Sequence, residues 1–233
     1  MEERSLAAGE KRIKFKCKRI GSISELLSVG EHSRKQYHCV AEQLSEALLE
    51  QEKYGLSPVI PADGKVAGNG ASKVMLNGVI YTLVTKSGRY AGEMDVLNSM
   101  CLISEFDTES WSCVYYSEHD NIRPTSDSPM HWCVLNLLPS KTLAESPTAA
   151  LHGHALATAE EAVKYNFPFS RETLFSTPED TEVMIEMLKE YTYPSHKVFI
   201  RLNHGYYILG QDVIDCRNVL HSEIIKKCES YLS

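Results

Sequence analysis

The sequence predicts one domain of the α/β class, with strands and helices following one another along its 233 residues. The clearest helix covers residues 32–53, where apolar side chains recur at helical spacing. The clearest strand pair is Lys73–Leu76 and Val79–Val84, joined by Asn77-Gly78, which is the strongest short hairpin signal. A chain of this length with 43% apolar residues can bury a sizeable core.

The other elements follow from the same two periodicities. Residues 13–20 alternate between apolar residues and lysines, which predicts a half-buried strand whose lysines keep a sheet edge from pairing with other chains. A lysine stripe that binds phosphate or nucleic acid is the less favoured alternative. The remaining predicted strands cover 100–105, 111–117, 149–154, 197–202 and 206–209, and further helices begin near Asp127, Thr158, Thr177 and Asp212.

Composition narrows the functional classes. The formal net charge of −7 argues against a nucleic-acid binder, which usually carries a basic face. No apolar run approaches the roughly 18 residues needed to span a bilayer, and the first residues do not have the layout of a secretory signal. The seven cysteines are scattered and form no C-x-x-C pair, so we expect reduced thiols and a cytoplasmic protein.

Histidines at the ends of two predicted strands form the first candidate site. His152 and His154 are two residues apart, so their side chains share one face of a strand and can reach one ion. The pair alone is a weak signal, because such histidines are more often polar or satisfied core residues. His204 strengthens it, since it follows another apolar strand and is followed by Gly205. Three neutral imidazoles suit zinc or a neighbouring divalent metal and leave coordination positions open for a substrate.

The segment from Arg123 to His131 is the second candidate. Thr125 and Ser126 lie where a helix begins, and backbone N–H groups and hydroxyls at such a terminus can bind phosphate. Asp127 could act as a base or as a metal ligand, although the segment taken alone favours a well-capped helix without a ligand. Two loops, Thr85–Gly88 and Gly68–Gly70, offer small residues and hydroxyls that could cradle an anion or simply form turns.

Taken in order, these motifs resemble those of the class II aldolase/adducin family, which includes L-fuculose-1-phosphate aldolase and L-ribulose-5-phosphate 4-epimerase. The resemblance covers about residues 32–220. It rests on Gly68-Asn69, Thr85-Lys86-Ser87-Gly88, Thr125-Ser126-Asp127-Ser128-Pro129-Met130-His131, His152-Gly153-His154 and Asn203-His204-Gly205.

The resemblance implies a three-layer α/β/α fold around a largely antiparallel sheet and, commonly, a homotetramer. It implies residues 1–31 as an N-terminal extension with an edge strand and 32–233 as a single class II aldolase/adducin-like domain. It assigns a metal, zinc by preference, to His152, His154 and His204. It assigns a substrate phosphate to Asn69, Ser87, Gly88, Thr125 and Ser126.

Departures from the family pattern bear on the chemistry. Asp127 stands where the aldolases carry a glutamate acid/base, and an aspartate there resembles the epimerase branch, in which it is a metal ligand. Gly153 stands where the family commonly has a residue with a side-chain hydroxyl group, and Lys86 stands in place of a proline. The family's C-terminal tyrosine has three unaligned candidates, Tyr206, Tyr207 and Tyr231.

The leading hypothesis is a metal-dependent lyase that cleaves a small sugar phosphate through a metal-stabilised enediolate, with Asp127 moving the proton. Epimerisation of a pentulose phosphate, dehydration and decarboxylation share that intermediate and stay open as alternatives. A non-catalytic, adducin-like binding module is the alternative from another class.

Overall fold

The computed structural model describes residues 14–138 and 146–228. Its centre is an eight-stranded sheet in the order β1-β5-β4-β3-β2-β6-β8-β7. The β1–β5 pairing is parallel and every other pairing is antiparallel. The strands are β1 (Lys16–Gly21), β2 (Asn69–Leu76), β3 (Val79–Thr85), β4 (Met100–Asp107), β5 (Ser112–Tyr116), β6 (Ala149–Gly153), β7 (Val198–Arg201) and β8 (Gly205–Gly210).

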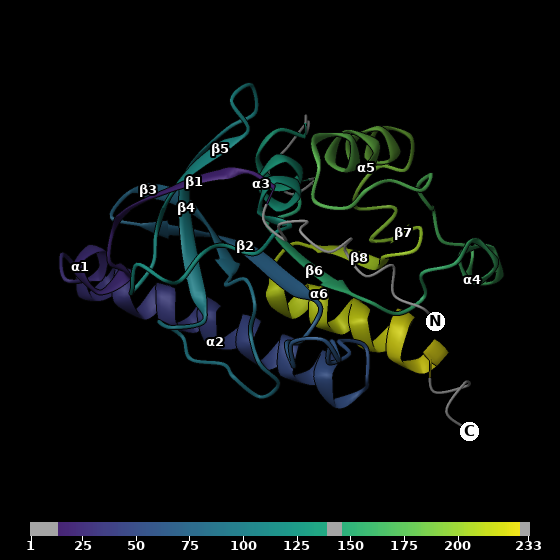
Figure 1. Cartoon of the computed structure of the whole chain (residues 1–233), viewed down its shortest axis with the longest axis horizontal. Coiled ribbons are helices and arrows are strands. Elements are labelled where there is room, and N and C mark those ends of the chain that lie inside the picture. Colours follow the sequence, from purple (N-terminus) through teal and green to yellow (C-terminus); the bar gives the residue numbers. More distant parts are fainter. Residues whose placement is uncertain (1–13, 139–145, 229–233) are drawn as a thin grey trace.

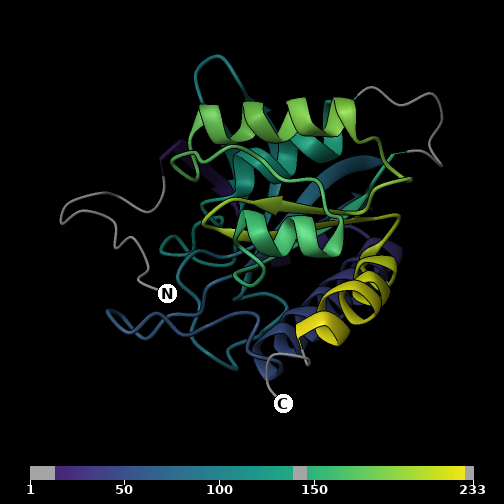
Figure 2. The ribbon, with the colours of Figure 1, turned by 90° about the vertical axis from the view of Figure 1, so that its right-hand side faces the viewer.

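Helices cover both faces of this sheet. In Figure 1, α2 (Glu31–Lys53) and α6 (Val213–Val219) run along the lower face, while α3 (Ser128–Asn136) and α5 (Pro178–Glu190) lie on the upper face. Figure 2 shows the same three layers from the side, with α4 (Ala159–Tyr165) in front of the sheet. The expected three-layer α/β/α arrangement around a largely antiparallel sheet is therefore confirmed.

Apolar side chains fill the space between these layers. Leu44 and Leu48 of α2 pack with Leu151 of β6 and Ile208 of β8 in the largest buried cluster. A second cluster joins α3 and α5 to the opposite face of the same strands and includes the fully buried Phe199 of β7. Because β6 and β8 are buried on both faces, polar residues on them are surrounded by protein and must find partners there.

Most predicted elements are present, with three differences. The last helix changes from α6 to a π-helical segment, Leu220–Ile225, and the short helix α1 (Ile23–Leu27) was not predicted. Asn69 and Gly70, which the sequence places in a loop, belong to β2. A Cβ on Gly70 would come within 2.8 Å of Leu44 Cδ1 and 2.9 Å of Leu151 Cδ2, so a larger residue here would push both leucine side chains aside.

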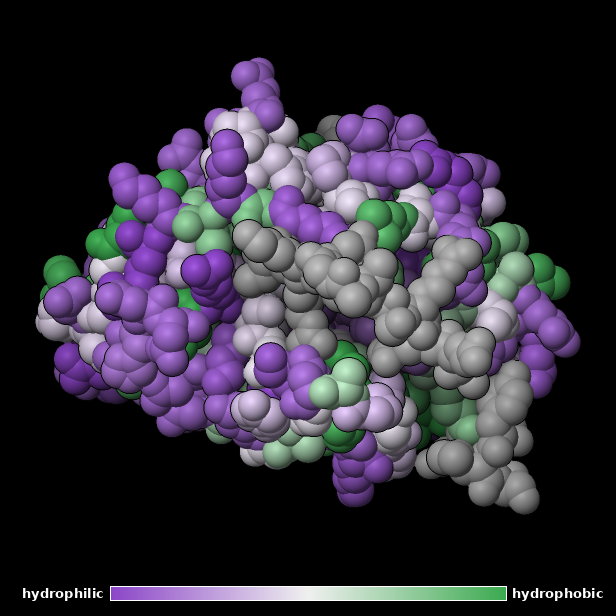
Figure 3. Space-filling model, viewed as in Figure 1, coloured by the Kyte–Doolittle hydropathy of each residue, from purple (hydrophilic) through white to green (hydrophobic). Residues whose placement is uncertain are grey.

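The surface of the molecule and its cysteines can be compared with what the composition predicts. Figure 3 shows a mainly hydrophilic face on which hydrophobic residues form small, separate groups. No helix in the described ranges is long and apolar enough to cross a membrane. The cysteines form no disulfide within those ranges; Cys101 and Cys216 are buried as expected, whereas Cys39 is exposed.

Candidate metal centre

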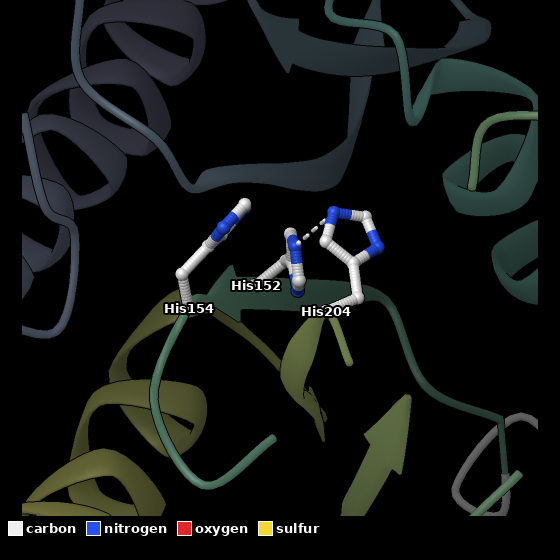
Figure 4. Close-up of side chains that lie close together, drawn as sticks. All are labelled: His152, His154 and His204. Atoms are coloured by element: carbon white, nitrogen blue, oxygen red, sulfur yellow. Dashed lines mark hydrogen bonds between the residues drawn. The ribbon is translucent and has the colours of Figure 1, made fainter. Parts of the chain in front are cut away.

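The three predicted histidines lie together at one end of the sheet. His152 is in β6, His154 directly follows that strand, and His204 lies in the turn from β7 to β8. One candidate ligand atom from each comes within 4.8 Å of the other two. Figure 4 shows the three imidazoles rising from the same side of the strand ends. The cluster could hold a metal ion, as the His-x-His and late histidine motifs predicted.

Backbone geometry brings His204 to the other two. β6 pairs with β8, so that His152 lies opposite Tyr207 and Gly153 opposite Tyr206. The turn before β8 uses Asn203 at φ 59° and Gly205 at φ +136°. A Cβ on Gly205 would overlap the Gly153 backbone, so this position needs glycine for both its dihedral angle and its close contact.

The hydrogen bond behind His152 leaves its other ring nitrogen available to a metal. Nδ1–H of His152 donates to the Tyr206 carbonyl at 2.8 Å, which leaves Nε2 as an acceptor. Nε2 of His152 and Nε2 of His204 are 3.3 Å apart. Two nitrogens at about 2.0–2.1 Å from a tetrahedral zinc would be separated by about 3.3–3.4 Å. The two rings therefore have the spacing of a zinc site.

The protonation state of His152 and His204 also suits the binding of a metal cation. Burial, together with the nearby Arg201 charge, lowers the pKa of His152 and of His204 well below the usual value. Both rings are therefore neutral, which is the form that binds metals. Within the described residues, Nδ1 of His204 is buried without a hydrogen-bond partner.

Asp127 supplies a carboxylate beside the histidines. It occupies the cap position of α3, yet its side chain makes no capping hydrogen bond. Instead its Oδ2 accepts from Asn69 Nδ2 at 2.8 Å and lies 3.8 Å from His152 Nε2. Burial alone would raise the pKa of Asp127, but the Arg201 guanidinium holds that pKa well below its usual range. The carboxylate is ionised and only 2% exposed.

A chain of hydrogen bonds leads from Asp127 into the core. Tyr207 Oη donates to Nδ1 of His131 at 2.8 Å, and Nε2–H of His131 donates to Asn69 Oδ1 at 2.6 Å. Asn69 then donates its amide to Asp127, and this orientation of the amide satisfies every member of the chain. His131 is thus hydrogen-bonded and is not among the clustered metal-ligand candidates.

The other candidate phosphate residues come from two adjoining segments. Thr125 N–H donates to Thr85 O at 2.8 Å, and Ser87 N–H donates to Arg123 O at 2.8 Å, so the two predicted loops run side by side. Gly88 has φ +72°, and a Cβ there would meet the Lys65 side chain at 3.2 Å. Ser126 is half-buried, directly before Asp127.

Several supporting residues were not predicted from the sequence. Gln51 of α2 is fully buried, and its Nε2 donates to Tyr206 Oη at 2.7 Å and to the His152 carbonyl at 3.3 Å. A Cβ on Gly153 would overlap Tyr206 Oη, so this tyrosine hydroxyl occupies the space of the side chain that the family pattern commonly has at position 153. Tyr231 lies outside the described residues. No spacing in the sequence links Gln51 to this strand.

Comparisons with known proteins agree with this architecture. A scan against protein-family models and a search of curated proteins found no significant match. Solved structures do match. An aldolase II superfamily protein from Pseudomonas syringae superposes with a TM-score of 0.61 and 13% identity, covering 91% of this chain and 79% of that one. The chain has the class II aldolase fold.

Two further structures extend the comparison. A sugar-phosphate aldolase from Thermotoga maritima matches this class II aldolase fold with a TM-score of 0.59 and 17% identity, over 86% of this chain and 97% of that chain. L-fuculose-1-phosphate aldolase from Thermus thermophilus matches with a TM-score of 0.53 and 16% identity, over 83% of this chain and 92% of that chain. At these identities the likeness establishes the fold, and the reaction depends on the chemistry of the site.

Proposed function

We propose that the chain is a metal-dependent lyase of the aldolase type that cleaves a small sugar phosphate. The observation that carries the proposal is one arrangement of three side chains. His152 Nε2 lies 3.3 Å from His204 Nε2 and 3.8 Å from the ionised Asp127 carboxylate, inside a class II aldolase fold. Open-sided histidine sites next to a carboxylate are typical of catalytic metals, whereas structural sites are closed.

Zinc is the metal we propose, held by His152, His154 and His204. When bound, a divalent ion supplies Lewis-acid stabilisation of the negative charge that develops on substrate oxygens. Asp127 is the proposed acid/base, because it is ionised and its Oδ2 faces the histidine cluster. Its fixed orientation favours proton transfer at one substrate position.

For the substrate phosphate we propose Asn69, Ser87, Gly88, Thr125 and Ser126 as the binding residues. The adjoining loops at 85–88 and 123–126 support this assignment, and the Lys65 side chain over Gly88 adds positive charge there. The Asn69 amide already donates to Asp127, so Asn69 would link phosphate binding to the position of the carboxylate.

A pentulose-phosphate 4-epimerase is the second candidate. It is favoured by an aspartate at position 127, 3.8 Å from His152 Nε2, which is close enough to become a metal ligand after a small shift. A related dehydratase or decarboxylase would use the same groups. An adducin-like binding module would not need an ionised carboxylate buried beside three histidines, so we do not favour it.

Three assignments accompany this proposal: a cytoplasmic location, a homotetramer, and an extension of residues 1–31 before a domain of residues 32–233. The extension includes β1, which is an edge strand of the sheet and pairs with β5. Light scattering tests the tetramer. A chain trimmed to 32–233 that unfolds cooperatively near the full-length midpoint would support the domain boundary.

Turnover of a panel of ketose 1-phosphates and pentulose 5-phosphates tests the reaction. Release of dihydroxyacetone phosphate supports the aldolase, and interconversion of pentulose epimers without cleavage supports the epimerase. Asp127→Asn should lower kcat by about 10²–10⁴-fold, while the exposed His32→Ala serves as a matched control on α2 and should leave kcat unchanged. If the metal-loaded protein turns over none of these phosphates, the lyase proposal is wrong.

A further inference from the structure

Arg201 joins two buried carboxylates beside the histidine cluster. It ends β7, is 2% exposed, and its Nη2 donates both to Asp180 Oδ2 and to Asp127 Oδ1, the latter at 3.3 Å. Asp127 and Asp180 are 2% and 4% exposed. An arginine at the end of an apolar strand gives no sequence sign of these partners, which are 74 and 21 positions away.

Asp180 is itself fixed by the start of α5. Its Oδ2 accepts from the Ser176 backbone N–H at 2.8 Å, and its Oδ1 accepts from Thr173 Oγ1 at 2.9 Å. The same segment reaches the site directly: Ser176 Oγ donates to Asp127 Oδ1 at 3.4 Å, and the Phe175 ring lies 4.6 Å from the His204 ring. Arg201 therefore ties Asp127 to an element that also covers a candidate ligand.

The two oxygens of Asp127 are used differently as a result. Oδ1 receives Arg201 and Ser176, while Oδ2 receives Asn69 and is the oxygen that lies 3.8 Å from His152 Nε2. Rotation of the carboxylate would break hydrogen bonds on both oxygens. The donors thus determine which oxygen faces the histidines.

The charges of Arg201, Asp127 and Asp180 favour the same arrangement. Two buried carboxylates share one guanidinium, which leaves a net negative charge next to the three histidines. A divalent cation held by those imidazoles would find this charge complementary. Nε and Nη1 of Arg201 have no hydrogen-bond partner in the described part of the chain. The side-chain hydrogen bonds that its guanidinium makes there therefore go from Nη2 to the two carboxylates.

We propose that Arg201 and Asp180 are positioning residues that hold Asp127 with Oδ2 directed at the metal. This proposal rests on the proposed function, because it needs a metal at the three histidines. Arg201 and Asp180 act through Asp127 and touch neither the metal nor the substrate.

Cobalt spectroscopy tests the proposal without a substrate. Co²⁺ binds the nitrogen ligands that zinc binds, and its visible absorption bands depend on the ligands and geometry around the ion. We expect Asp127→Asn to shift these bands and Arg201→Met to shift them as well. The double variant should add no further shift beyond Asp127→Asn, because Arg201 acts only through that carboxylate.

Arg89→Met is the matched control. Arg89 is 3% exposed and pairs with Glu52, so the variant also removes a buried guanidinium from an ion pair, but one that does not include Asp127. Its Co²⁺ bands should equal those of the wild type. If Arg201→Met does not fold, Asp180→Asn keeps the side-chain shape and the Arg201 charge, and should shift the bands in the same direction.

The outcomes separate this proposal from the proposed function. Bands in the wild type that neither Arg201→Met nor Asp180→Asn alters, while Asp127→Asn does, would overturn the positioning role alone. Bands that Asp127→Asn leaves unchanged would overturn it too. Absence of any Co²⁺ bands in the wild type would contradict the metal site itself, and both proposals with it.

Discussion

Nδ1–H of His152 donates to the backbone carbonyl of Tyr206 at 2.8 Å, and this contact directs the opposite nitrogen at the candidate metal position. A ligand histidine held this way needs no rearrangement to bind an ion. The contact also makes the metal centre depend on how β8 is placed against β6, because the carbonyl belongs to β8 and the ring to β6. Residues that fix these two strands should therefore affect metal binding.

Gln51 is the first such residue. Gln51→Met removes the donor to Tyr206 Oη and to the His152 carbonyl and leaves both oxygens buried without that partner. We expect the free energy of unfolding to fall by about 1–3 kcal/mol and zinc affinity to fall about 10–100-fold, measured by urea denaturation and by competition with a chelator. Gln43→Met, on the same helix and bonded through its amide to Cys39 Sγ, should change neither quantity. Equal effects of the two variants would contradict the role of Gln51.

Gly153 is the second residue that we expect to affect metal binding through these strands. Gly153→Ala places a methyl group in the space that Tyr206 Oη occupies, between two candidate ligands. Overpacking of this kind costs about 1–3 kcal/mol, so thermal unfolding should show a lower midpoint, together with weaker zinc binding. Gly30→Ala is the control, because Gly30 has an extended φ of −159° and its Cβ would meet Asn77 Oδ1 at an ordinary 3.5 Å. A Gly153→Ala protein with wild-type stability and zinc affinity would show that Tyr206 moves freely.

Because His131 is buried, we expect the free energy of unfolding to depend on pH. Burial lowers its pKa to about 4, from a usual value of 6.5. Between these values the unfolded chain binds a proton that the folded chain does not, so stability rises with pH and is lost as pH falls from about 6.5 toward 4. The contribution is on the order of 3 kcal/mol.

Urea denaturation of the metal-free protein at several pH values measures this effect. His152 and His204 contribute in the same direction, so the informative quantity is the difference from His131→Gln. The variant should lose less stability than the wild type between pH 7 and pH 4. Parallel curves for the two proteins would mean that folding does not lower the pKa of His131.

The sequence predicted the fold better than it predicted the support of the site. Periodicity located α2, the Asn77-Gly78 hairpin and the strands that carry the histidines, because each is a local pattern. Asn69 was placed in a loop because glycines flank it, whereas it pairs with His152 of β6 and is the first residue of β2. The π-helical segment after α6 leaves the apolar spacing of the last helix almost unchanged, so the sequence does not reveal it.

In the candidate site, too, local motifs could be predicted from the sequence and tertiary contacts could not. His152, His154 and His204 are recognisable because they follow one another in a known order of motifs along the chain. Arg201 pairs with residues from α5 and from the cap of α3, and these partners become neighbours only when β7, α3 and α5 contribute to one buried cluster. Tertiary pairings of this kind have no fixed spacing along the chain.

Metal analysis of protein purified without chelators tests the central claim most directly. We expect about one zinc or similar divalent ion per chain, lost in His152→Ala and His204→Ala and retained in His32→Ala, whose histidine lies exposed on α2 outside the cluster. Each variant should keep its circular dichroism spectrum, so that loss of metal reports on the site. A wild-type protein that stays metal-free after incubation with zinc, or a His152→Ala protein that keeps a full equivalent, would contradict the metal centre.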